Sequence, residues 1–269
     1  MIKIVTLSGA SYTLTPTVFP DGTSQVWKLP DSIFASSYLE VTWNFEAERE
    51  IIDLLSLRKL LPEDKYTWDL HIPYLPYARQ DKDVSNTSTF NLSVIADLIN
   101  SLDCRKVTSV DVHNPDQTGR LINNFENVEV AELHKLLVRQ KEVDYRVFGD
   151  NSASLRYRSE STAAAIVCDK EREPLTGNII GHKITFASKL ENKSGPYSFL
   201  IVDDLCDGGA TFISVANMLR QKYGSDVKSI DLYVTHGVFS KGRDHLLNNG
   251  INKLFTTNSL TKNGDGYNV

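Results

Sequence analysis

A short apolar run that leads into acidic residues, two glycines and a helix constrains this chain more than any other feature. The run Phe199–Val202 has the length of one buried strand, and Asp203 follows it directly. Beyond Gly208 and Gly209, the segment Thr211–Tyr223 repeats apolar residues at helical spacing, which predicts a helix packed on a sheet. This order is typical of an α/β fold, in which ligands bind at the carboxyl ends of the strands.

The loop between that strand and that helix has the composition of a phosphate site. Its two glycines let successive backbone amides approach an anion, and the helix N-terminus adds partial positive charge. Asp203 and Asp204 would repel a phosphate, so we expect them to accept hydrogen bonds from sugar hydroxyls or to hold hydrated Mg²⁺. A sugar phosphate satisfies both parts. In the structural alternative, Asp207 or Thr211 caps the helix and the acids are only solvated.

Strands and helices alternate along the whole chain. The first half opens with strands and continues with a helix between Phe45 and Leu61. Its later segments are predicted as strand 68–74, helix 92–99 and strand 106–113. The second half is predicted as strand 145–148, helix 161–169, strand 198–203, helix 211–223 and strand 227–235. We therefore predict an α/β protein of two similar domains, residues 1–143 and 144–269, each a mainly parallel sheet flanked by helices.

Composition excludes several classes of protein. The 269 residues carry a net charge of −5, which argues against nucleic acid as a partner because phosphate neutralisation needs a surplus of Lys and Arg. No run approaches the ~18 apolar residues of a membrane span, and the start lacks a signal-peptide pattern. The 3 cysteines form no C-x-x-C pair and fit free thiols in a reducing compartment. We expect a cytoplasmic protein with no membrane partner.

Two segments resemble a known family. Asp203–Thr211 resembles the phosphoribosyl-pyrophosphate loop shared by type I phosphoribosyltransferases and ribose-phosphate pyrophosphokinases. Pro73–Lys82 is similar to the segment with which the pyrophosphokinases contact ATP, and the transferases lack it. From the residues alone, two prolines stiffen the exit from a strand and present Arg79 and Gln80 to phosphate oxygens and to base or sugar edges. Alone, such a segment is most often an exposed polar loop.

Two further segments of the first half resemble the same family. Phe19–Gly22 is similar to its adenine-binding turn, in which an aromatic ring stacks on the base and an acid accepts from the amino group. Ser109–His113 resembles a strand end whose His helps to bind the Mg²⁺ of MgATP. Without the resemblance, the first would be an ordinary turn and the second a structural His.

Two segments of the second half extend the resemblance. Phe148–Ala153 aligns with a family loop of sequence S-P-D-A-G-G, of which only Asp150 remains, at the position of a metal-binding acid. Cys168–Arg172 matches the start of the family's flexible catalytic loop, in which Lys170 and Arg172 would stabilise the transferring phosphates. Unaided, these charged residues would be interpreted as a solvated helix end.

The resemblance implies two phosphoribosyltransferase-like domains and one reaction. The β,γ-pyrophosphoryl group of MgATP passes to the C1 hydroxyl of ribose 5-phosphate, giving phosphoribosyl pyrophosphate and AMP, with Mg²⁺ as cofactor and a homo-oligomer, dimer or hexamer, as the acting form. The implied site residues are Lys170 and Arg172 for catalysis; Phe19, Asp21, Arg79, Gln80 and Asp81 for ATP; Asp203, Asp204, Asp207, Gly208, Gly209, Ala210 and Thr211 for ribose 5-phosphate; and His113 and Asp150 for metal. A type I phosphoribosyltransferase and a catalytically silent regulatory homologue remain the alternatives.

Overall fold

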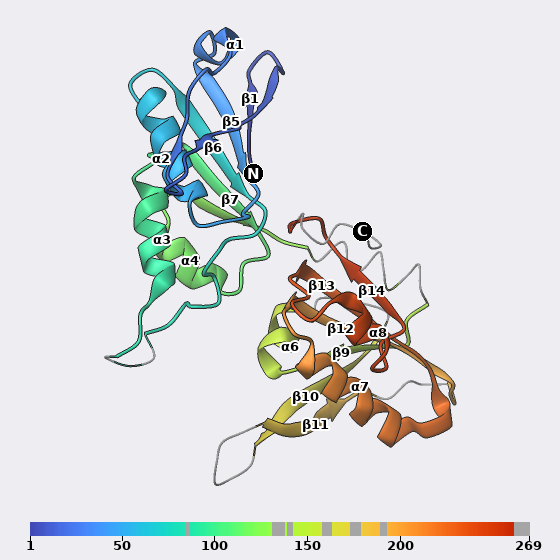
Figure 1. The fold of residues 1–269 in the computed structure, drawn as a ribbon. Helices are drawn as coiled ribbons and strands as arrows, with labels where there is room; N and C mark the ends of the chain where they lie inside the picture. Colours follow the sequence, from blue (N-terminus) through green and yellow to red (C-terminus); the bar gives the residue numbers. More distant parts are fainter. Residues whose placement is uncertain are drawn as a thin grey trace. The chain divides into compact units, whose positions relative to one another are not determined.

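The computed structural model forms two compact units, Met1–Glu129 and Val130–Asn258 (Figure 1). It describes residues 1–83, 85, 87–130, 138, 142–157, 163–172, 179–188 and 193–260, apart from the side chains of residues 172, 179 and 180. Both units are mainly parallel sheets flanked by helices, so the predicted fold class is confirmed. The domain boundary at residues 143 and 144 stays a prediction. Across these described ranges, we find no helix with the length and apolar character of a membrane span.

The first unit is built on a six-stranded sheet with the strand order β2-β1-β5-β6-β7-β8. The strands are β1 (Ile2–Thr6), β2 (Ser11–Thr13), β5 (Tyr38–Trp43), β6 (Thr67–Ile72), β7 (Lys106–Val110) and β8 (Phe125–Val128). Strands β5 to β8 are parallel, whereas β1 is antiparallel to both of its neighbours. The smaller elements are the hairpin strands β3 (Thr17–Val18) and β4 (Ser24–Gln25) and the short helix α1 (Asp31–Phe34).

Three helices connect the parallel strands of the first unit. They are α2 (Glu50–Leu60), α3 (Asn91–Asn100) and α4 (Pro115–Leu121). Because strand order follows chain order from β5 to β8, and such connections are right-handed, all three helices cover one face of the sheet (Figure 1). Burial along the strands agrees: in β6, Trp68, Leu70 and Ile72 are buried, while the residues between them are only half-buried.

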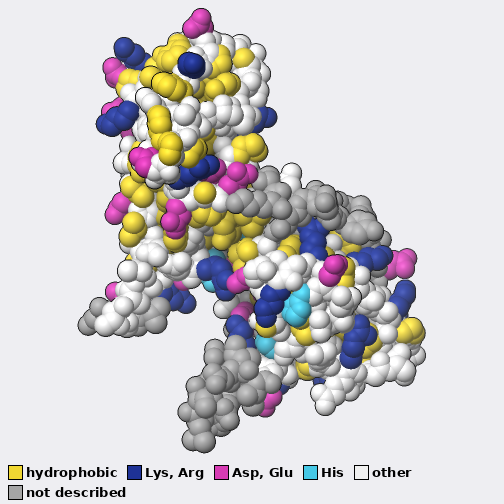
Figure 2. All heavy atoms as spheres, viewed as in Figure 1, with side chains coloured by type: hydrophobic (Ala, Val, Ile, Leu, Met, Phe, Trp, Pro, Cys, Tyr) yellow, Lys and Arg dark blue, Asp and Glu magenta, His cyan; other side chains and the backbone are white. Residues whose placement is uncertain are grey.

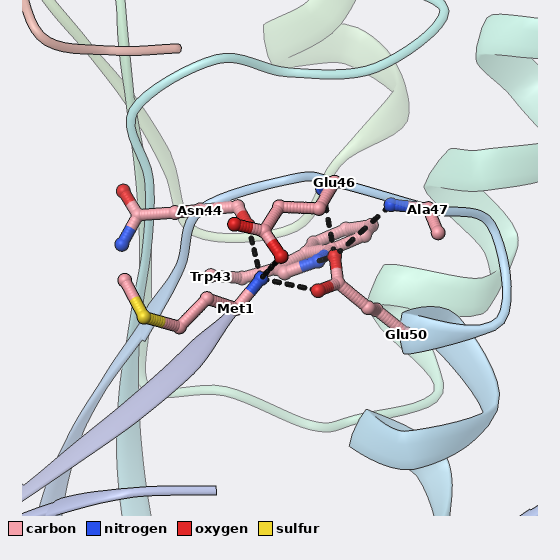
Figure 3. A network of polar contacts seen from close by, with 6 residues as sticks. All are labelled: Met1, Trp43, Asn44, Glu46, Ala47 and Glu50. Carbon is pink, nitrogen blue, oxygen red and sulfur yellow. Dashed lines mark hydrogen bonds and ion pairs between the residues drawn. The ribbon is translucent and has the colours of Figure 1, made fainter. Parts of the chain in front are cut away.

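A polar network joins β1, β5 and α2 in the first unit (Figure 3). The carboxylate of Glu50 accepts hydrogen bonds from the indole nitrogen of Trp43 at 3.0 Å and from the backbone nitrogen of Glu46 at 2.8 Å, and it forms an ion pair with the amino group of Met1. The amino group of Met1 also donates to the backbone oxygen of Asn44 at 2.6 Å. The network holds the start of β1 to the start of α2.

The second unit has a sheet of strand order β11-β10-β9-β12-β13-β14. The strands are β9 (Tyr145–Phe148), β10 (Ala164–Arg172), β11 (Ile179–Ala187), β12 (Tyr197–Cys206), β13 (Val227–Gly237) and β14 (Lys253–Thr256); the helices are α6 (Asn151–Tyr157), α7 (Ala210–Tyr223) and α8 (Arg243–Leu247), with the 3₁₀ turn η1 (Gly224–Asp226). All neighbouring strands are parallel except β10 and β11. The predicted strand at 145–148 and helix at 211–223 are confirmed.

Strand order reverses between β9 and β12. The chain leaves β9 through α6 toward β10 on one side, and it leaves β12 through α7 toward β13 on the other. Right-handed connections then set α6 and α7 on opposite faces of the sheet, and the central strands are buried almost without interruption. A reversal of this kind opens a crevice at the carboxyl ends of the two strands, which is where ligands bind in such sheets.

The predicted helix at 161–169 is wrong, because this segment forms most of β10. Alanines next to Ile166 and Val167 have a fair helix propensity, but β10 pairs with β9 on one side and with β11 on the other. Ile166 and Cys168 are completely buried in the core of the second unit. Tertiary pairing and burial therefore override the local preference, and Lys170 and Arg172 lie on a strand.

The three cysteines are free thiols, as predicted, and the structure shows that all three are buried. Burial raises the pKa of Cys104, Cys168 and Cys206 to about 12 in each case. A thiol with so high a pKa holds its proton near neutral pH and is a poor nucleophile. Cys206, although it lies next to the predicted phosphate loop, is therefore a packing residue.

Candidate functional site

The glycine loop lies between β12 and α7. β12 extends to Cys206, so the acidic residues that the sequence assigns to the loop are the last part of the strand. Gly209 has a φ of +79°, the left-handed conformation that glycine adopts without strain, and it directly precedes α7. No side-chain hydrogen bond caps the helix at this residue, against the structural alternative in which Asp207 or Thr211 is the cap. The first amides of α7 keep the capacity to bind an anion.

The segment after β13 supports this loop from one side. The backbone nitrogens of Val238 and Phe239 donate to the carbonyl oxygen of Cys206 at 2.9 and 3.1 Å. A Cβ atom at Gly209 would lie 2.6 Å from Cδ2 of Leu246 on α8, so a side chain at residue 209 would require Leu246 to shift. At Gly208, a Cβ atom would meet the methylene chain of Lys241, with its Cε at 3.5 Å. Sequence reasoning missed Lys241, which lies outside every segment singled out from the sequence.

The two aspartates at the end of β12 differ in their environments. Burial, and then the negative charges of Asp204 and Asp150, raise the pKa of Asp203 above its usual range. Asp204 is itself buried, and its carboxylate lies 3.6 Å from the guanidinium of Arg156 on α6. Arg156 is a second residue that the sequence did not single out, because it lies beyond the Phe148–Ala153 segment that carries the resemblance. Burial and the neighbouring carboxylates thus disfavour the ionised form of Asp203, and a ligand cation or a hydroxyl donor would stabilise it.

Asp150 and Lys170 meet at the carboxyl ends of β9 and β10. One carboxylate oxygen of Asp150 accepts from the backbone nitrogen of Ala153 at 2.9 Å, which caps the start of α6, and the other lies 3.4 Å from Nζ of Lys170. Parallel pairing of Val167 with Phe148 brings the two side chains to the same sheet edge. The structure thus joins a predicted metal ligand to a predicted catalytic cation. The side chain of Arg172 lies outside the described residues.

His182 on β11 lies opposite Lys170 in the antiparallel pair. It is buried, and its Nδ1 is 2.9 Å from the hydroxyl of Ser214 on α7, while its Nε2 has no hydrogen-bond partner among the described residues. Burial, and then the charge of Lys170, lower the pKa of His182. A neutral imidazole therefore links the β10–β11 pair to the helix behind the glycine loop. Only the register of β10 and β11, which the sequence did not predict, identifies this residue.

The predicted ATP segment of the first unit follows β6, and the predicted His113 site follows the neighbouring strand β7. The amide of Asn114 donates to the carboxylate of Asp81 at 2.7 Å, which joins the two loops. Arg79, Gln80 and His113 are exposed, so each can reach a ligand in solvent. The side-chain oxygen of Gln80 accepts from the amide of Asn91 at 2.6 Å.

The predicted adenine turn forms the hairpin of β3 and β4. The carboxylate of Asp21 accepts from the backbone nitrogen and the hydroxyl of Thr23 at 3.0 and 2.8 Å, and these bonds lower the pKa of Asp21. Phe19 is partly exposed. The hydroxyl of Ser24 donates to Asp53 on α2 at 2.5 Å, so the hairpin is fixed to α2.

The arrangement of the described side chains can be compared with what a Mg²⁺ site requires. Across the described residues, no group of three or more His, Cys, Asp or Glu side chains is arranged to hold a metal ion. Mg²⁺ in phosphate-transfer sites is usually held by one or two carboxylates together with water and substrate phosphates, and it does not need a cage of protein ligands. The neighbouring carboxylates of Asp150 and Asp203 fit that mode of binding.

Comparisons with known proteins agree on one family of relatives, although no family model matches the chain. A ribose-phosphate pyrophosphokinase of Mycoplasmopsis pulmonis is 24% identical over 263 residues, covering 93% of this chain and 77% of the relative. One of Mycoplasma pneumoniae is 28% identical over 205 residues, which is 70% of this chain but only 58% of the relative's length. The crystal structure of phosphoribosylpyrophosphate synthetase from Mycobacterium smegmatis superposes with a TM-score of 0.72 at 20% identity, over 96% of this chain and 84% of that one.

Proposed function

We propose that this chain, which belongs to the ribose-phosphate pyrophosphokinase family, transfers the β,γ-pyrophosphoryl group of MgATP to the C1 hydroxyl of ribose 5-phosphate. The hydroxyl oxygen attacks the β-phosphorus, the bond from that phosphorus to the bridging oxygen of AMP breaks, and the hydroxyl proton passes to solvent. The products are phosphoribosyl pyrophosphate and AMP. One observation carries the proposal: an uncapped glycine loop, the carboxylates of Asp203 and Asp150, and Lys170 share one sheet edge.

In this proposal the second unit binds the sugar phosphate. Residues Asp207, Gly208, Gly209, Ala210 and Thr211 hold the 5-phosphate through the first amides of α7. Asp203 and Asp204 accept hydrogen bonds from the ribose hydroxyls, with Arg156 neutralising Asp204. Binding at both ends orients the C1 hydroxyl, and positioning of this kind supplies much of the rate acceleration in phosphoryl transfer.

The first unit, in this proposal, binds ATP. Arg79 contacts phosphate oxygens with its guanidinium, and Gln80 and Asp81 contact the nucleotide beside it. Phe19 stacks on adenine while Asp21 accepts from its amino group. His113 in the first unit and Asp150 in the second would each offer a ligand for Mg²⁺, which would neutralise charge on the triphosphate.

Lys170 and Arg172 are the proposed catalytic residues. Their cations would lower the energy of the transition state, in which negative charge grows on the oxygens of the transferring group. Lys170 is half-buried beside Asp150, so it is held in position before substrates bind. No covalent nucleophile is needed for this reaction.

Release of AMP tests the proposal. Purified protein is incubated with MgATP and ribose 5-phosphate, and each substrate is omitted in turn. The proposal requires AMP that forms only when both substrates are present. Consumption of phosphoribosyl pyrophosphate in the presence of a nucleobase, with no response to ATP, would instead identify a type I phosphoribosyltransferase.

The contacts of Asp150 favour a second candidate, a catalytically silent regulatory homologue. Its carboxylate is already engaged by the backbone of α6 and by Lys170, so the metal ligand and the catalytic cation neutralise each other. A silent homologue would bind both substrates in calorimetry without releasing AMP. The enzyme would do both, since substrate phosphates compete with Asp150 for Lys170.

The acting form is proposed to be a cytoplasmic homo-oligomer, a dimer or a hexamer. This follows from the family resemblance. Sedimentation velocity at several protein concentrations would measure the assembly, and a monomer at all concentrations would contradict it.

A further inference from the structure

Lys241 lies across the glycine loop, and the function proposed above does not yet use it. It occupies the tight turn Phe239–Gly242, which is closed by a 2.8 Å hydrogen bond from the nitrogen of Gly242 to the oxygen of Phe239. Phe239 and Gly242, the two ends of the turn, have φ angles of +46° and +80°. Two further bonds from Val238 and Phe239 hold the turn to the end of β12.

The side chain of Lys241 contacts the loop through its methylenes and not through its charge. Its Cγ, Cδ and Cε atoms lie 3.8, 3.6 and 3.5 Å from the position of a Cβ on Gly208. The residue is exposed, and within the described residues its ammonium has no hydrogen-bond or ion-pair partner. A lysine that packs its stem on a backbone and keeps its charge in solvent is a common way to present a cation.

The neighbouring cations are already engaged. The guanidinium of Arg243 lies 5.2 Å from the ring centroid of Phe239, Lys170 pairs with Asp150, and Arg156 pairs with Asp204. Figure 2 shows Lys and Arg side chains together with His side chains on the visible face of the second unit. Lys241 is therefore the cation at the glycine loop that remains available to a ligand among the residues described.

We infer that Lys241 is a specificity-determining residue, whose ammonium binds the phosphate of the sugar substrate and makes the loop select phosphorylated over unphosphorylated pentoses. The inference rests on the proposed function for the identity of the sugar. Backbone amides alone bind an anion through partial charges, whereas an added ammonium makes a charge-assisted hydrogen bond. The methylene packing on Gly208 keeps the stem of Lys241 against the loop, two residues before the start of α7.

Calorimetric titration of the full chain with ribose 5-phosphate and with ribose tests this inference. We expect Lys241→Met, which keeps the packing on Gly208, to weaken binding of ribose 5-phosphate roughly tenfold, the effect of one charge-assisted bond. Binding of ribose should not change, and Lys241→Arg should retain most of the affinity. The matched control is Lys228→Met, an exposed lysine at the opposite end of β13, about 30 Å along the strand from Gly237.

The outcomes separate this inference from the proposed reaction. Unchanged affinity of Lys241→Met for ribose 5-phosphate, or an equal loss for ribose, overturns the role of Lys241 whatever the AMP assay shows. A selective loss of affinity in a protein that releases no AMP supports the role of Lys241 and contradicts the reaction. If the wild-type chain binds no ribose 5-phosphate, both fail.

Discussion

The two units differ in the strand order of their sheets and in the placement of their helices. In the first, strand order follows chain order through all four parallel strands, the helices cover one face, and burial alternates along each strand. In the second, order reverses between β9 and β12, helices cover both faces, and the central strands are buried throughout. Only the second arrangement opens a crevice between diverging connections. The difference shows how related sheets come to present ligand groups in different ways.

The charged side chains of the two units also differ in their exposure to solvent. In the first unit, Arg79 and His113 are exposed on loops, where water screens each contact. In the second, Asp203 has a raised pKa, and Lys170 is paired with Asp150 at the same edge. Charges fixed at a partly buried edge act on the transition state without reorganising, while exposed side chains mainly add binding. We therefore expect substitutions in the second unit to change kcat and those in the first to change KM for ATP.

The largest expected effect belongs to Lys170. If the second unit carries the chemistry, Lys170→Ala should lower kcat roughly 10²–10⁴-fold, the usual cost of removing a cation that stabilises the transition state. Steady-state AMP release would measure it, with circular dichroism to verify folding. Lys183→Ala, an exposed lysine one residue from His182 on β11, is the matched control and should retain full turnover.

A Lys170→Ala protein that keeps most of its turnover would contradict the catalytic assignment. A large rise in KM for ATP with unchanged kcat would instead place Lys170 among the binding residues. In that case the expected difference, with kcat effects in the second unit and KM effects in the first, would not hold.

Gly209→Ala should be the next largest change, since it tests the loop itself. An alanine there meets Leu246 and must also adopt a positive φ, so we expect a loss of about 2–4 kcal/mol in the free energy of unfolding. Chemical denaturation measures the loss, and hydrogen exchange along α7 would assign it to the second unit. Gly9→Ala is the control: its φ is +83° but no atom is near, so it should lose only about 1 kcal/mol. Equal losses would mean that Leu246 moves aside freely.

Local sequence was sufficient for the parts of the second unit in which one signal acts alone. The segment Tyr145–Phe148, predicted as a strand, became β9, and the apolar stripe that ends at Tyr223 became α7. The glycine loop was identifiable because a positive φ selects glycine, a condition that Gly209 meets. Such signals depend on the backbone near the residue and need no distant partner.

The remaining elements and site contacts depend on residues that are distant in the sequence. The alanine-rich segment before Lys170 became a strand because β9 and β11 pair with it, and β11 was not predicted at all. The roles of Arg156 and Lys241 also depend on contacts with residues far along the chain, at Asp204 and Gly208. Periodicity cannot report such contacts, since it records only which face of an element is apolar.

Arg79→Ala tests the first unit. Its guanidinium is exposed, so its loss should raise KM for ATP about tenfold and leave kcat within about a factor of two, as expected for removal of one charge-assisted contact. Initial rates at varied MgATP with saturating ribose 5-phosphate would separate the two constants. Lys82→Ala, at an exposed position three residues along the chain, would distinguish a specific contact from general attraction. A loss of kcat comparable to that of Lys170→Ala would show that both units carry the chemistry.

The smallest expected effect is a change in stability at Asp203. It tests the charge difference between the two units more specifically than the other substitutions do. The pKa of Asp203 is raised in the folded state, so the folded chain binds more protons than the unfolded chain between about pH 4 and about pH 8. The free energy of unfolding therefore falls at this residue as the pH rises through that interval. Asp203→Asn removes this titration. Its Tm should exceed that of the wild type by roughly 2–4 °C near pH 8 and should match it near pH 4. Asp226→Asn, at an exposed position of η1, should shift Tm equally little at both values. If Asp203→Asn gains Tm and loses binding of ribose 5-phosphate, the second unit gives up stability to keep a carboxyl group for its ligand. If the difference in Tm between Asp203→Asn and the wild type does not depend on pH, neighbouring groups already compensate the charge of Asp203. In that case the two units do not differ in this way.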